Sequence, residues 1–353
     1  MRSVSFSSKK ISISVIMPVY RWDPFLPEAM NSIINQTLPP TEIIIICDEP
    51  SNEIKQFLEK INLKNIQVIP VYNSIKLGIA KSLNIGISLS KSKYIARMDA
   101  DDICLPFRFE KQITYLEKNK NIGVCGTSIK TIGKSPEIIY RFPLNTELIK
   151  AKIFWGWALA HPTVVFRSSV LKTMDTWYDP NFDHCEDYEL WSRLKNITEM
   201  GNLYEVMLYY RIHEKNICLI NHVHQKKLEN LVRQKLLSEL ITNPLNREYD
   251  LFNIICNDNI NSYEDLFEIE ILFEKLIASN KNLCVYNDGA FNDFLHENWH
   301  RICLNMSSEG VKIFKIFYNS QLYDRKSFIK NCSLKILIKG IFYELIKKFG
   351  TDK

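Results

Sequence analysis

The chain has 353 residues, of which 46% are hydrophobic and 24% charged, a composition typical of a globular protein with a large apolar core. Its formal net charge of +5 is small and is concentrated near the end, where residues 325–353 hold eight lysines or arginines and two acids. A duplex-binding protein more often shows a basic stripe across its fold, which argues against a nucleic-acid partner.

The cysteines and the apolar runs indicate a cellular compartment. The nine cysteines are scattered and never form a Cys-x-x-Cys spacing, which argues against a disulfide framework and a zinc site and favours a reducing environment. The N-terminus has no apolar segment of the secretory type, and no apolar run approaches the roughly 20 residues that span a bilayer. We expect a cytoplasmic protein, with a peripheral position at the inner face of the cell membrane left open.

Strand and helix patterns alternate over the first hundred residues. In chain order we expect strands at 11–18, 42–47, 66–72 and 94–98, and helices at 25–36, 52–61 and 78–88. This alternation predicts an α/β fold with a mostly parallel sheet flanked by helices. Ligands bind such sheets outside the carboxyl ends of the strands.

The pattern changes after residue 122. Between residues 122 and 143, Gly123, Gly126 and Gly133 predict short strands in an antiparallel extension of the sheet. Residues 186–191 then open a helix, and residues 206–210 form a strand.

After about residue 220 the strand signals fade, and Leu, Glu and Lys recur with helical spacing. We therefore predict two parts, an α/β domain at 1–220 and a helical C-terminal region at 221–353.

Three carboxylates follow the strand at 94–98. Asp99 and Asp101 are two residues apart, so on an extended backbone they point to the same side, and Asp102 is expected to point elsewhere. Oxygen ligands of this kind favour a hard divalent ion such as Mg²⁺ or Mn²⁺. A solvated acidic turn explains this motif alone equally well. Two other strand ends, Pro18–Tyr20 and Asp48-Glu49, lie at the same expected edge and favour a ligand site.

Six motifs occur in an order found in one protein family. They are Ser-Val-Ile-Met-Pro-Val-Tyr at 14–20, Asp48-Glu49, Asp99-Ala100-Asp101-Asp102, His161-Pro162-Thr163, Glu186-Asp187-Tyr188-Glu189-Leu190-Trp191 and Tyr210-Arg211-Ile212-His213. Over roughly residues 11–216 the chain resembles a family 2 glycosyltransferase of the GT-A fold, the group that builds bacterial surface polysaccharides.

The resemblance implies a nucleotide-sugar site at the strand ends. Tyr20 would lie against a uracil ring, and Glu49 would contact the base where the family commonly has a second aspartate. Asp99 would face the ribose and the metal. The residues implied for this site are Pro18, Val19, Tyr20, Asp48, Glu49, Gly78, Asn84 and Asp99.

The resemblance also implies metal and catalytic residues. Asp99, Asp101 and His213 would bind Mn²⁺ or Mg²⁺, and Asp187 would act as the catalytic base. By position alone, Asp187 is better explained as an acid that stabilises the start of its own helix, and the family motif reverses this preference. His213 is, without its neighbours, more often an ordinary histidine than a ligand.

Acceptor contacts are implied for Trp157, His161 and Glu186. For His161, a turn at the following proline or simple packing is a comparable explanation. Trp155 and Trp157 would stack on sugar faces, although burial in the core explains them equally well. Arg108 is expected to form a structural ion pair near the acidic loop.

These features predict an inverting, metal-dependent glycosyltransferase. It would move a hexose from a UDP-sugar to a glycan acceptor, held on a lipid carrier, in surface polysaccharide, O-antigen or capsule biosynthesis. One alternative is a sugar nucleotidyltransferase, which normally needs a glycine-rich loop after its first strand, whereas residues 11–30 contain no glycine. The other alternative is a non-catalytic glycan- or nucleotide-binding module.

The tail adds one more expectation. Its apolar residues recur at helical spacing, and two lysines lie together off that face: Leu334, Ile338, Ile341, Leu345 and Phe349, with Lys335 and Lys339. Such a helix could lie on an anionic bilayer surface, which predicts peripheral membrane contact through residues 325–353. A terminal helix packed on the domain explains the pattern equally well.

Overall fold

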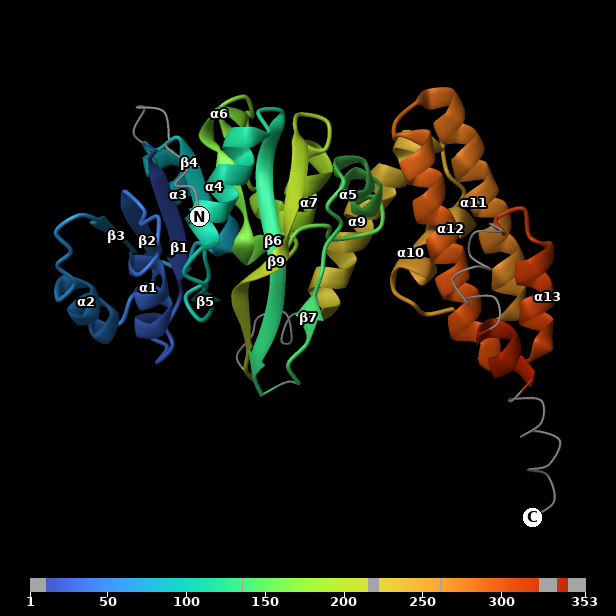
Figure 1. Ribbon diagram of the computed structural model, residues 1–353, viewed down its shortest axis with the longest axis horizontal. Coiled ribbons are helices and arrows are strands. Elements are labelled where there is room, and N and C mark those ends of the chain that lie inside the picture. The colour runs from blue at the N-terminus through green and yellow to red at the C-terminus, as the bar shows by residue number, and fades with distance from the viewer. Residues whose placement is uncertain (1–10, 135, 215–221, 261, 324–334, 342–353) are drawn as a thin grey trace, which may run out of the picture. The chain divides into compact units, whose positions relative to one another are not determined.

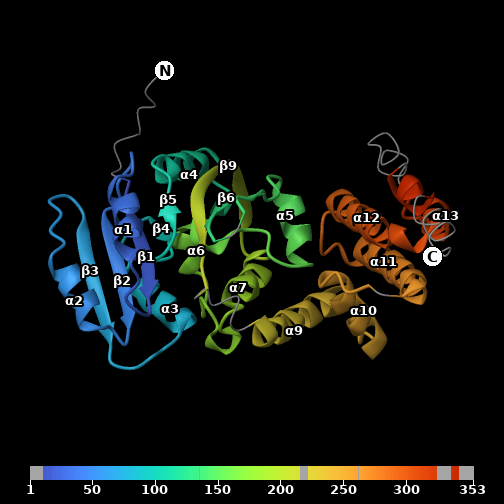
Figure 2. The same cartoon turned by 90° about the horizontal axis from the view of Figure 1, so that it is seen from below.

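The structure is a computed structural model, shown in Figure 1 and, turned by 90°, in Figure 2. It describes residues 11–134, 136–214, 222–260, 262–323 and 335–341. The chain divides into two compact units, one made of residues 1–149 and 157–229 and the other of residues 150–156 and 230–353. Each unit is described by itself.

The first unit is built on one sheet with the strand order β3-β2-β1-β4-β8-β6-β9-β5. Its first half is parallel and consists of β1 (Ile13–Val19), β2 (Glu42–Asp48), β3 (Gln67–Asn73) and β4 (Tyr94–Arg97). The helices between them are α1 (Leu26–Ile34), α2 (Asn52–Glu59) and α3 (Ile79–Leu89). The predicted alternation and the predicted parallel sheet are confirmed.

Both faces of the parallel half are covered by helices. On one face, Val15 of β1 and Ile43 of β2 share a core with Met30 of α1. On the other face, Ile16 lies so close to Gly86 of α3 that a Cβ at position 86 would be 2.4 Å from Ile16 Cγ2. Burial from both sides explains why β1 and β2 are nearly continuous runs of apolar residues.

The second half of the sheet is mixed. It contains β5 (Ile103–Cys104), β6 (Ile122–Gly133), β7 (Ile139–Tyr140), β8 (Val165–Arg167) and β9 (Glu199–Ile212). β8 is antiparallel to β4 and β6, β9 is parallel to β6, and β5 is antiparallel to β9. The other elements of this part are α4 (Arg108–Lys118), α5 (Thr146–Ile153), η1 (His161–Thr163), α6 (Ser168–Leu171), η2 (Pro180–Phe182) and α7 (Glu186–Leu194).

The prediction of short strands in an antiparallel extension after residue 122 is confirmed in part. The strand β7 is short and antiparallel to β6, but β6 is one long strand whose longest pairing, with β9, is parallel. Its glycines permit close approach and do not break the strand. A Cβ at Gly123 would be 2.4 Å from Thr198 Oγ1, and a Cβ at Gly126 would be 2.4 Å from Asn202 Oδ1. Glycine at these positions therefore lets neighbouring side chains lie against the strand.

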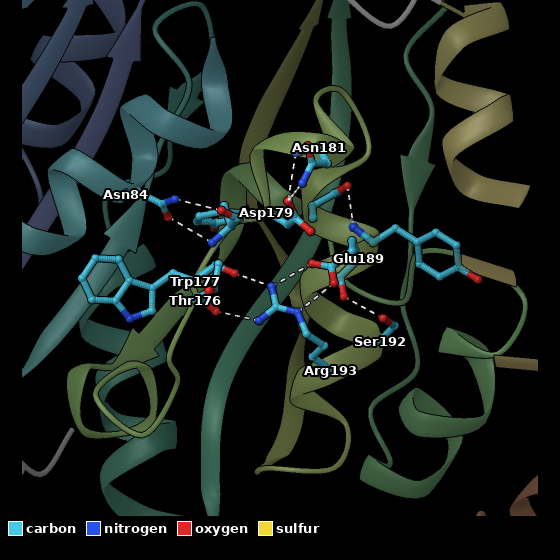
Figure 3. Close-up of polar contacts among 11 residues, drawn as sticks. Asn84, Thr176, Trp177, Asp179, Asn181, Glu189, Ser192 and Arg193 are labelled. Carbon is cyan, nitrogen blue, oxygen red and sulfur yellow. Dashed lines mark hydrogen bonds and ion pairs between the residues drawn. The ribbon is translucent and has the colours of Figure 1, made fainter. Parts of the chain in front are cut away.

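The segment ahead of α7 is fixed by side chains from two helices (Figure 3). Arg193 on α7 donates to both carboxylate oxygens of Glu189 and to the backbone carbonyls of residues 176–177. Asn84 on α3 donates to the Tyr178 carbonyl at 2.8 Å and accepts from the Tyr178 amide at 3.0 Å. These bonds hold the backbone around Tyr178 in place next to the start of α7.

The second unit is helical, as predicted for the C-terminal region. The helices after the sheet are α9 (His222–Leu240), α10 (Asn246–Cys256), α11 (Tyr263–Leu283), α12 (Asp288–Asn305), η3 (Met306–Glu309) and α13 (Val311–Asn319). The core of this unit is aromatic: the ring of Phe154 packs against Phe252, Tyr286 and Phe291 at centroid distances of 4.7, 5.7 and 5.4 Å. Across the described parts of the chain, no helix combines the length and apolar character needed to cross a membrane.

Candidate active site

The site lies at the carboxyl ends of the parallel strands, where three aspartates follow β4. One carboxylate oxygen from each of Asp99, Asp101 and Asp102 lies within 4.8 Å of the others, and we call these residues the aspartate cluster. The expectation that Asp102 points elsewhere is wrong, because the chain leaves the extended conformation after Arg97 and bends at residues 100–101.

The electrostatics of the aspartate cluster suit a bound cation. Asp102 is fully buried, its Oδ1 accepts from the Arg211 amide at 2.8 Å, and its Oδ2 has no hydrogen-bond partner among the described residues. Burial and the charges of Asp99 and Asp101 raise the pKa of Asp102 well above its usual value. Burial also raises the pKa of Asp99, with a contribution from Asp101, against the opposing effect of Arg97. A buried carboxylate oxygen without a donor is the kind of ligand that a hard divalent ion uses.

His213 reaches the aspartate cluster from β9. β5, which begins directly after the cluster, pairs with β9 through Ile103 and Tyr209. This pairing places His213 Nε2 2.9 Å from Asp101 Oδ2. The predicted grouping of His213 with Asp101 is therefore present, although the compact set of oxygens belongs to the three aspartates.

A buried arginine lies beside the aspartate cluster. Arg97, the last residue of β4, is 5% exposed, and its NH1 contacts Asp99 Oδ2 at 2.5 Å. Its charge also interacts with Asp102, Glu186 and the Tyr178 hydroxyl. Arg97 therefore pairs with the aspartate cluster and lies within electrostatic range of a second acidic group.

That second group is the acid pair, Glu186 and Asp187, in the first turn of α7. Burial, together with the charge of Asp187, raises the pKa of Glu186 to about 8. Burial also raises the pKa of Asp187, although its Oδ1 accepts from the Tyr188 amide at 2.7 Å. Glu186 Oε2 is buried without a hydrogen-bond partner in the described structure.

His161 connects the acid pair to Tyr178. Its Nε2 is 2.9 Å from the Tyr178 hydroxyl, and its Nδ1 is 3.7 Å from Glu186 Oε1. Burial and the charge of Arg97 hold the pKa of His161 well below its usual value, so the ring is neutral near pH 7. A neutral histidine in this position hydrogen-bonds to the Tyr178 hydroxyl, lies close to Glu186 and adds no charge to the site.

The residues implied for nucleotide binding lie at the same edge of the sheet. Pro18 and Val19 end β1, and the ring of Tyr20 has Lys76 Nζ 4.4 Å and the Arg21 guanidinium 4.7 Å from its centroid. Both cations therefore lie against the ring that was expected to face a base.

Asp48 and Glu49 differ in environment. Asp48 is buried and accepts from Asn73 Nδ2 at 2.7 Å and from the amides of Leu77 and Gly78 at 3.1 and 2.9 Å. Glu49 is exposed with a φ of 50°. Asp48 thus fixes the loop that leads into α3, and Glu49 is the more accessible of the two carboxylates.

Gly78 and Asn84 have clear structural roles. Gly78 has a φ of 85°, and a Cβ there would lie 3.3 Å from Asp183 Oδ1, so this position suits glycine. The Asn84 side chain bonds to the backbone of Tyr178, as described above (Figure 3).

The two candidate tryptophans lie in different environments. Trp157 is 53% exposed and lies 5.9 Å from the Phe142 ring. Trp155 instead belongs to the aromatic core of the second unit, with ring contacts to Phe252, Phe273 and Phe294 at 5.6–5.9 Å. These contacts favour the alternative explanation for Trp155, which is packing in a core.

Arg108 does not form the expected ion pair. It is fully buried, and its NH2 donates to the Arg97 carbonyl at 2.8 Å while its Nε donates to Gln112 at 3.1 Å. Its role is to hold the end of β4. Sequence reasoning missed Arg97 and Tyr178, and the signal for Arg97 was a charge inside an otherwise apolar buried strand.

Comparison with known proteins identifies the family. The sequence profile described as Glycosyl transferase family 2 matches residues 14–174. An uncharacterized glycosyltransferase of Haemophilus influenzae is 31% identical over 343 residues, covering 93% of this chain and 96% of that protein. This chain belongs to glycosyltransferase family 2.

Other relatives of this glycosyltransferase have more specific names. The O-antigen biosynthesis glycosyltransferase WbnJ of Escherichia coli is 33% identical over 67% of this chain and 94% of WbnJ. The UDP-Glc:alpha-D-GlcNAc-diphosphoundecaprenol beta-1,3-glucosyltransferase WfgD of Escherichia coli is 27% identical over 69% of this chain and 92% of WfgD.

A solved structure shares the fold of this glycosyltransferase. The crystal structure of S. aureus TarS 1–349 in complex with UDP-GlcNAc superposes with a TM-score of 0.54 at 16% identity, over 96% of this chain and 92% of that one. The predicted GT-A type fold with a helical C-terminal region is confirmed.

Glu186 should make the stability of this glycosyltransferase depend on pH. Its pKa is about 8 in the folded protein against an ordinary value of 4.5, so between these values only the folded state keeps the proton. The free energy of unfolding should therefore fall as the pH rises through this window, by at most about 1.4 kcal/mol per pH unit.

The measurement is denaturant unfolding from pH 5 to pH 8.5, with a chelator present, for the wild type and Glu186→Gln. The variant cannot titrate at this position and should lose this part of the slope. Identical slopes for the two proteins would contradict the assignment.

Proposed function

We propose that this glycosyltransferase moves a hexose from a UDP-sugar to a lipid-linked glycan, with Mn²⁺ or Mg²⁺ and with inversion at the anomeric carbon. The product would enter a surface polysaccharide such as O-antigen or capsule. The observation that supports this most is that two acidic groups, the aspartate cluster and the acid pair, both lie within electrostatic range of the buried Arg97. One acidic group suits a metal-bound diphosphate, and the other suits a base.

The donor would lie along the strand ends. Tyr20, Lys76 and Arg21 offer an aromatic ring and two cations for the nucleotide, and Glu49 is accessible to a base. Asp99, Asp101 and Asp102 would hold the divalent cation, with His213 beside Asp101. A cation bound there supplies Lewis-acid stabilisation of the leaving UDP.

The acceptor would be activated at α7. The Asp187 carboxylate accepts the proton of the acceptor hydroxyl as that oxygen attacks the anomeric carbon from the face opposite the leaving UDP. A single displacement of this kind inverts the anomeric configuration. Glu186 precedes Asp187 in the chain and His161 lies 3.7 Å from Glu186, and both are buried, so we propose that they orient the base, while the exposed ring of Trp157 is available to an acceptor sugar.

The relatives support the substrate classes. The names of WfgD and of the TarS complex include a UDP-sugar, and WfgD acts on a diphosphoundecaprenol-linked sugar. The name of WbnJ refers to O-antigen biosynthesis. A lipid-linked acceptor of this type would place the enzyme in the cytoplasm, at the inner face of the cell membrane.

The test is a screen of UDP-hexoses against a synthetic diphospholipid acceptor with Mn²⁺, with the product linkage read by NMR. We expect UDP release that depends on the acceptor, and a β-linkage from an α-linked donor. Pyrophosphate release would instead indicate a nucleotidyltransferase, and binding without turnover would indicate a non-catalytic module. Retention of the α-configuration would overturn the single displacement.

We further propose that the enzyme contacts an anionic membrane through its second unit. Of the predicted contact region 325–353, the structure describes residues 335–341, and the rest of that prediction lies outside the described residues. This helical turn docks through Ile336, which is fully buried, and through Gly340, where a Cβ would be 3.0 Å from the Gly310 backbone. Ile338 and Ile341 remain 55% and 43% exposed.

Exposed lysines occur on the same turn as these isoleucines and elsewhere on the second unit. Lys335 and Lys339 lie on the same turn, and Lys312 and Lys315 on α13 are exposed as well. Exposed isoleucines among lysines suit the interface of an anionic bilayer, since each lysine near such a surface contributes about 1 kcal/mol.

Reversing two of these charges should weaken membrane binding. We expect Lys335→Glu with Lys339→Glu to reduce co-sedimentation with phosphatidylglycerol vesicles by roughly tenfold or more. The matched control is Lys55→Glu on α2 with Lys60→Glu at its C-cap, the same charge change on the first unit. Equal sedimentation of the two double variants would argue against this surface.

A further inference from the structure

Arg97 occupies an unusual position for a charged residue. It ends a strand in which all four residues are buried, and a buried charge is costly unless it is paired. Its NH1 pairs with Asp99, but its Nε is buried and has no hydrogen-bond partner among the residues the structure describes. The pairing of Arg97 is therefore incomplete.

The unpaired groups near Arg97 are carboxyl oxygens that can accept a hydrogen bond from its guanidinium. Glu186 Oε2 and Asp102 Oδ2 are also buried without partners in the described parts of the chain. The charge of Arg97 interacts with both of these carboxyl groups as well as with Asp99. The Arg97 guanidinium thus pairs with Asp99 and lies within electrostatic range of Glu186, whose Oε2 has no hydrogen-bond partner among the described residues.

The backbone of Arg97 is held firmly. Its amide donates to the Val164 carbonyl at 3.0 Å, and its carbonyl accepts from Arg108 NH2 at 2.8 Å. Any adjustment must therefore come from the side chain, which has two sets of acids within electrostatic range.

We infer that Arg97 is a positioning residue. Its guanidinium stays paired with Asp99 until a divalent cation binds Asp99, and the Arg97 side chain then pairs with Glu186 of the acid pair. This inference rests on the proposed metal-dependent function. Arg97 competes with the cation for Asp99, so it weakens cation binding in the donor-free enzyme. It also aligns Asp99 and, through Glu186, the start of α7 with Asp187, so it favours turnover.

The two roles give opposite effects in one variant. Arg97→Gln keeps hydrogen-bond donors but removes the charge. It should bind Mn²⁺ roughly five- to tenfold more tightly without nucleotide, since a nearby positive charge is lost. At saturating Mn²⁺, its kcat for UDP release should fall by about tenfold or more, because Asp99 and the acid pair lose their shared partner. Arg97→Lys keeps the charge and should return Mn²⁺ affinity to near the wild-type value.

The control is Arg167→Gln. Arg167 is another largely buried arginine of the first unit, and it donates to the carbonyls of Ile122, Leu116 and Asn119. Its loss should reduce stability and leave Mn²⁺ affinity unchanged. If the role of Arg97 were only structural, Arg97→Gln would likewise reduce stability and leave Mn²⁺ affinity unchanged.

Mn²⁺ binding is measured by electron paramagnetic resonance of the free ion, on the full chain without donor. Weaker or unchanged Mn²⁺ binding by Arg97→Gln would overturn the inference. If the wild type binds no Mn²⁺ at all, both the inference and the proposed metal dependence are wrong. If the wild type binds Mn²⁺ and Arg97→Gln binds it no more tightly, only the inference is wrong.

A second measurement does not depend on any variant folding. In the wild type, the Arg97 guanidinium NMR signal should shift with Mg²⁺ along the same curve as metal binding. A signal that stays constant to saturation would also overturn the inference.

Discussion

Asp187→Asn should abolish glycosyl transfer while leaving the fold intact. Asparagine cannot accept the proton of the acceptor hydroxyl, and the loss of a positioned base typically costs about 10²- to 10⁴-fold in rate. The amide keeps an oxygen to accept from the Tyr188 amide, which now donates to Asp187 Oδ1 at 2.7 Å. The measurement is acceptor-dependent UDP release at saturating substrates, with thermal unfolding of both proteins as a check.

The matched control for Asp187→Asn is Glu189→Gln on the same helix. Glu189 is buried and pairs with Arg193 at 2.7 Å, so its replacement should cost stability through the segment ahead of α7 (Figure 3) but leave turnover within a few-fold. If Asp187→Asn remains fully active, the assignment of the base is wrong.

Asp101→Asn should separate metal binding from folding. Asp101 belongs to the aspartate cluster and contacts His213 at 2.9 Å, so removing its charge takes away one ligand and leaves the histidine with a weaker partner. We expect Mn²⁺ affinity to fall by more than about tenfold, and turnover at low Mn²⁺ to fall with it. High Mn²⁺ should restore part of the activity.

The control for Asp101→Asn is Asp179→Asn. Asp179 accepts from the Asn181 amide at 2.9 Å at the start of η2, a bond that an asparagine oxygen can also accept. This variant should keep wild-type Mn²⁺ affinity. If Asp101→Asn keeps the Mn²⁺ affinity and the turnover of the wild type, the aspartate cluster does not bind the catalytic metal.

Local pattern was enough to predict the parallel half of the sheet and the edge where polar residues gather. Runs such as Ile43–Cys47 are buried on both faces, and such runs differ clearly from helices in sequence. The aspartates after β4 were found because they follow one of these runs directly. These features depend on residues close together in the chain.

The missed features depend on contacts between distant residues. The direction of Asp102 follows from a bend and from the amide of Arg211, which is 109 residues away. The glycines of β6 were read as turn signals because their real neighbours, Thr198 and Asn202, come much later in the chain. The interaction of Arg97 with Glu186 likewise joins β4 to α7, which lies far along the chain, so no local pattern contains it.

In the proposed mechanism, the contact between Gly78 and Asp183 would couple the donor side of the site to the acceptor side. Gly78 caps α3, which follows the loop on the proposed donor side, and Asp183 precedes α7, which holds Asp187. A Cβ at position 78 would lie 3.3 Å from Asp183 Oδ1, so a bulkier residue there would displace one loop or the other. On the proposed function, selection for a new donor through this contact would therefore also alter acceptor choice.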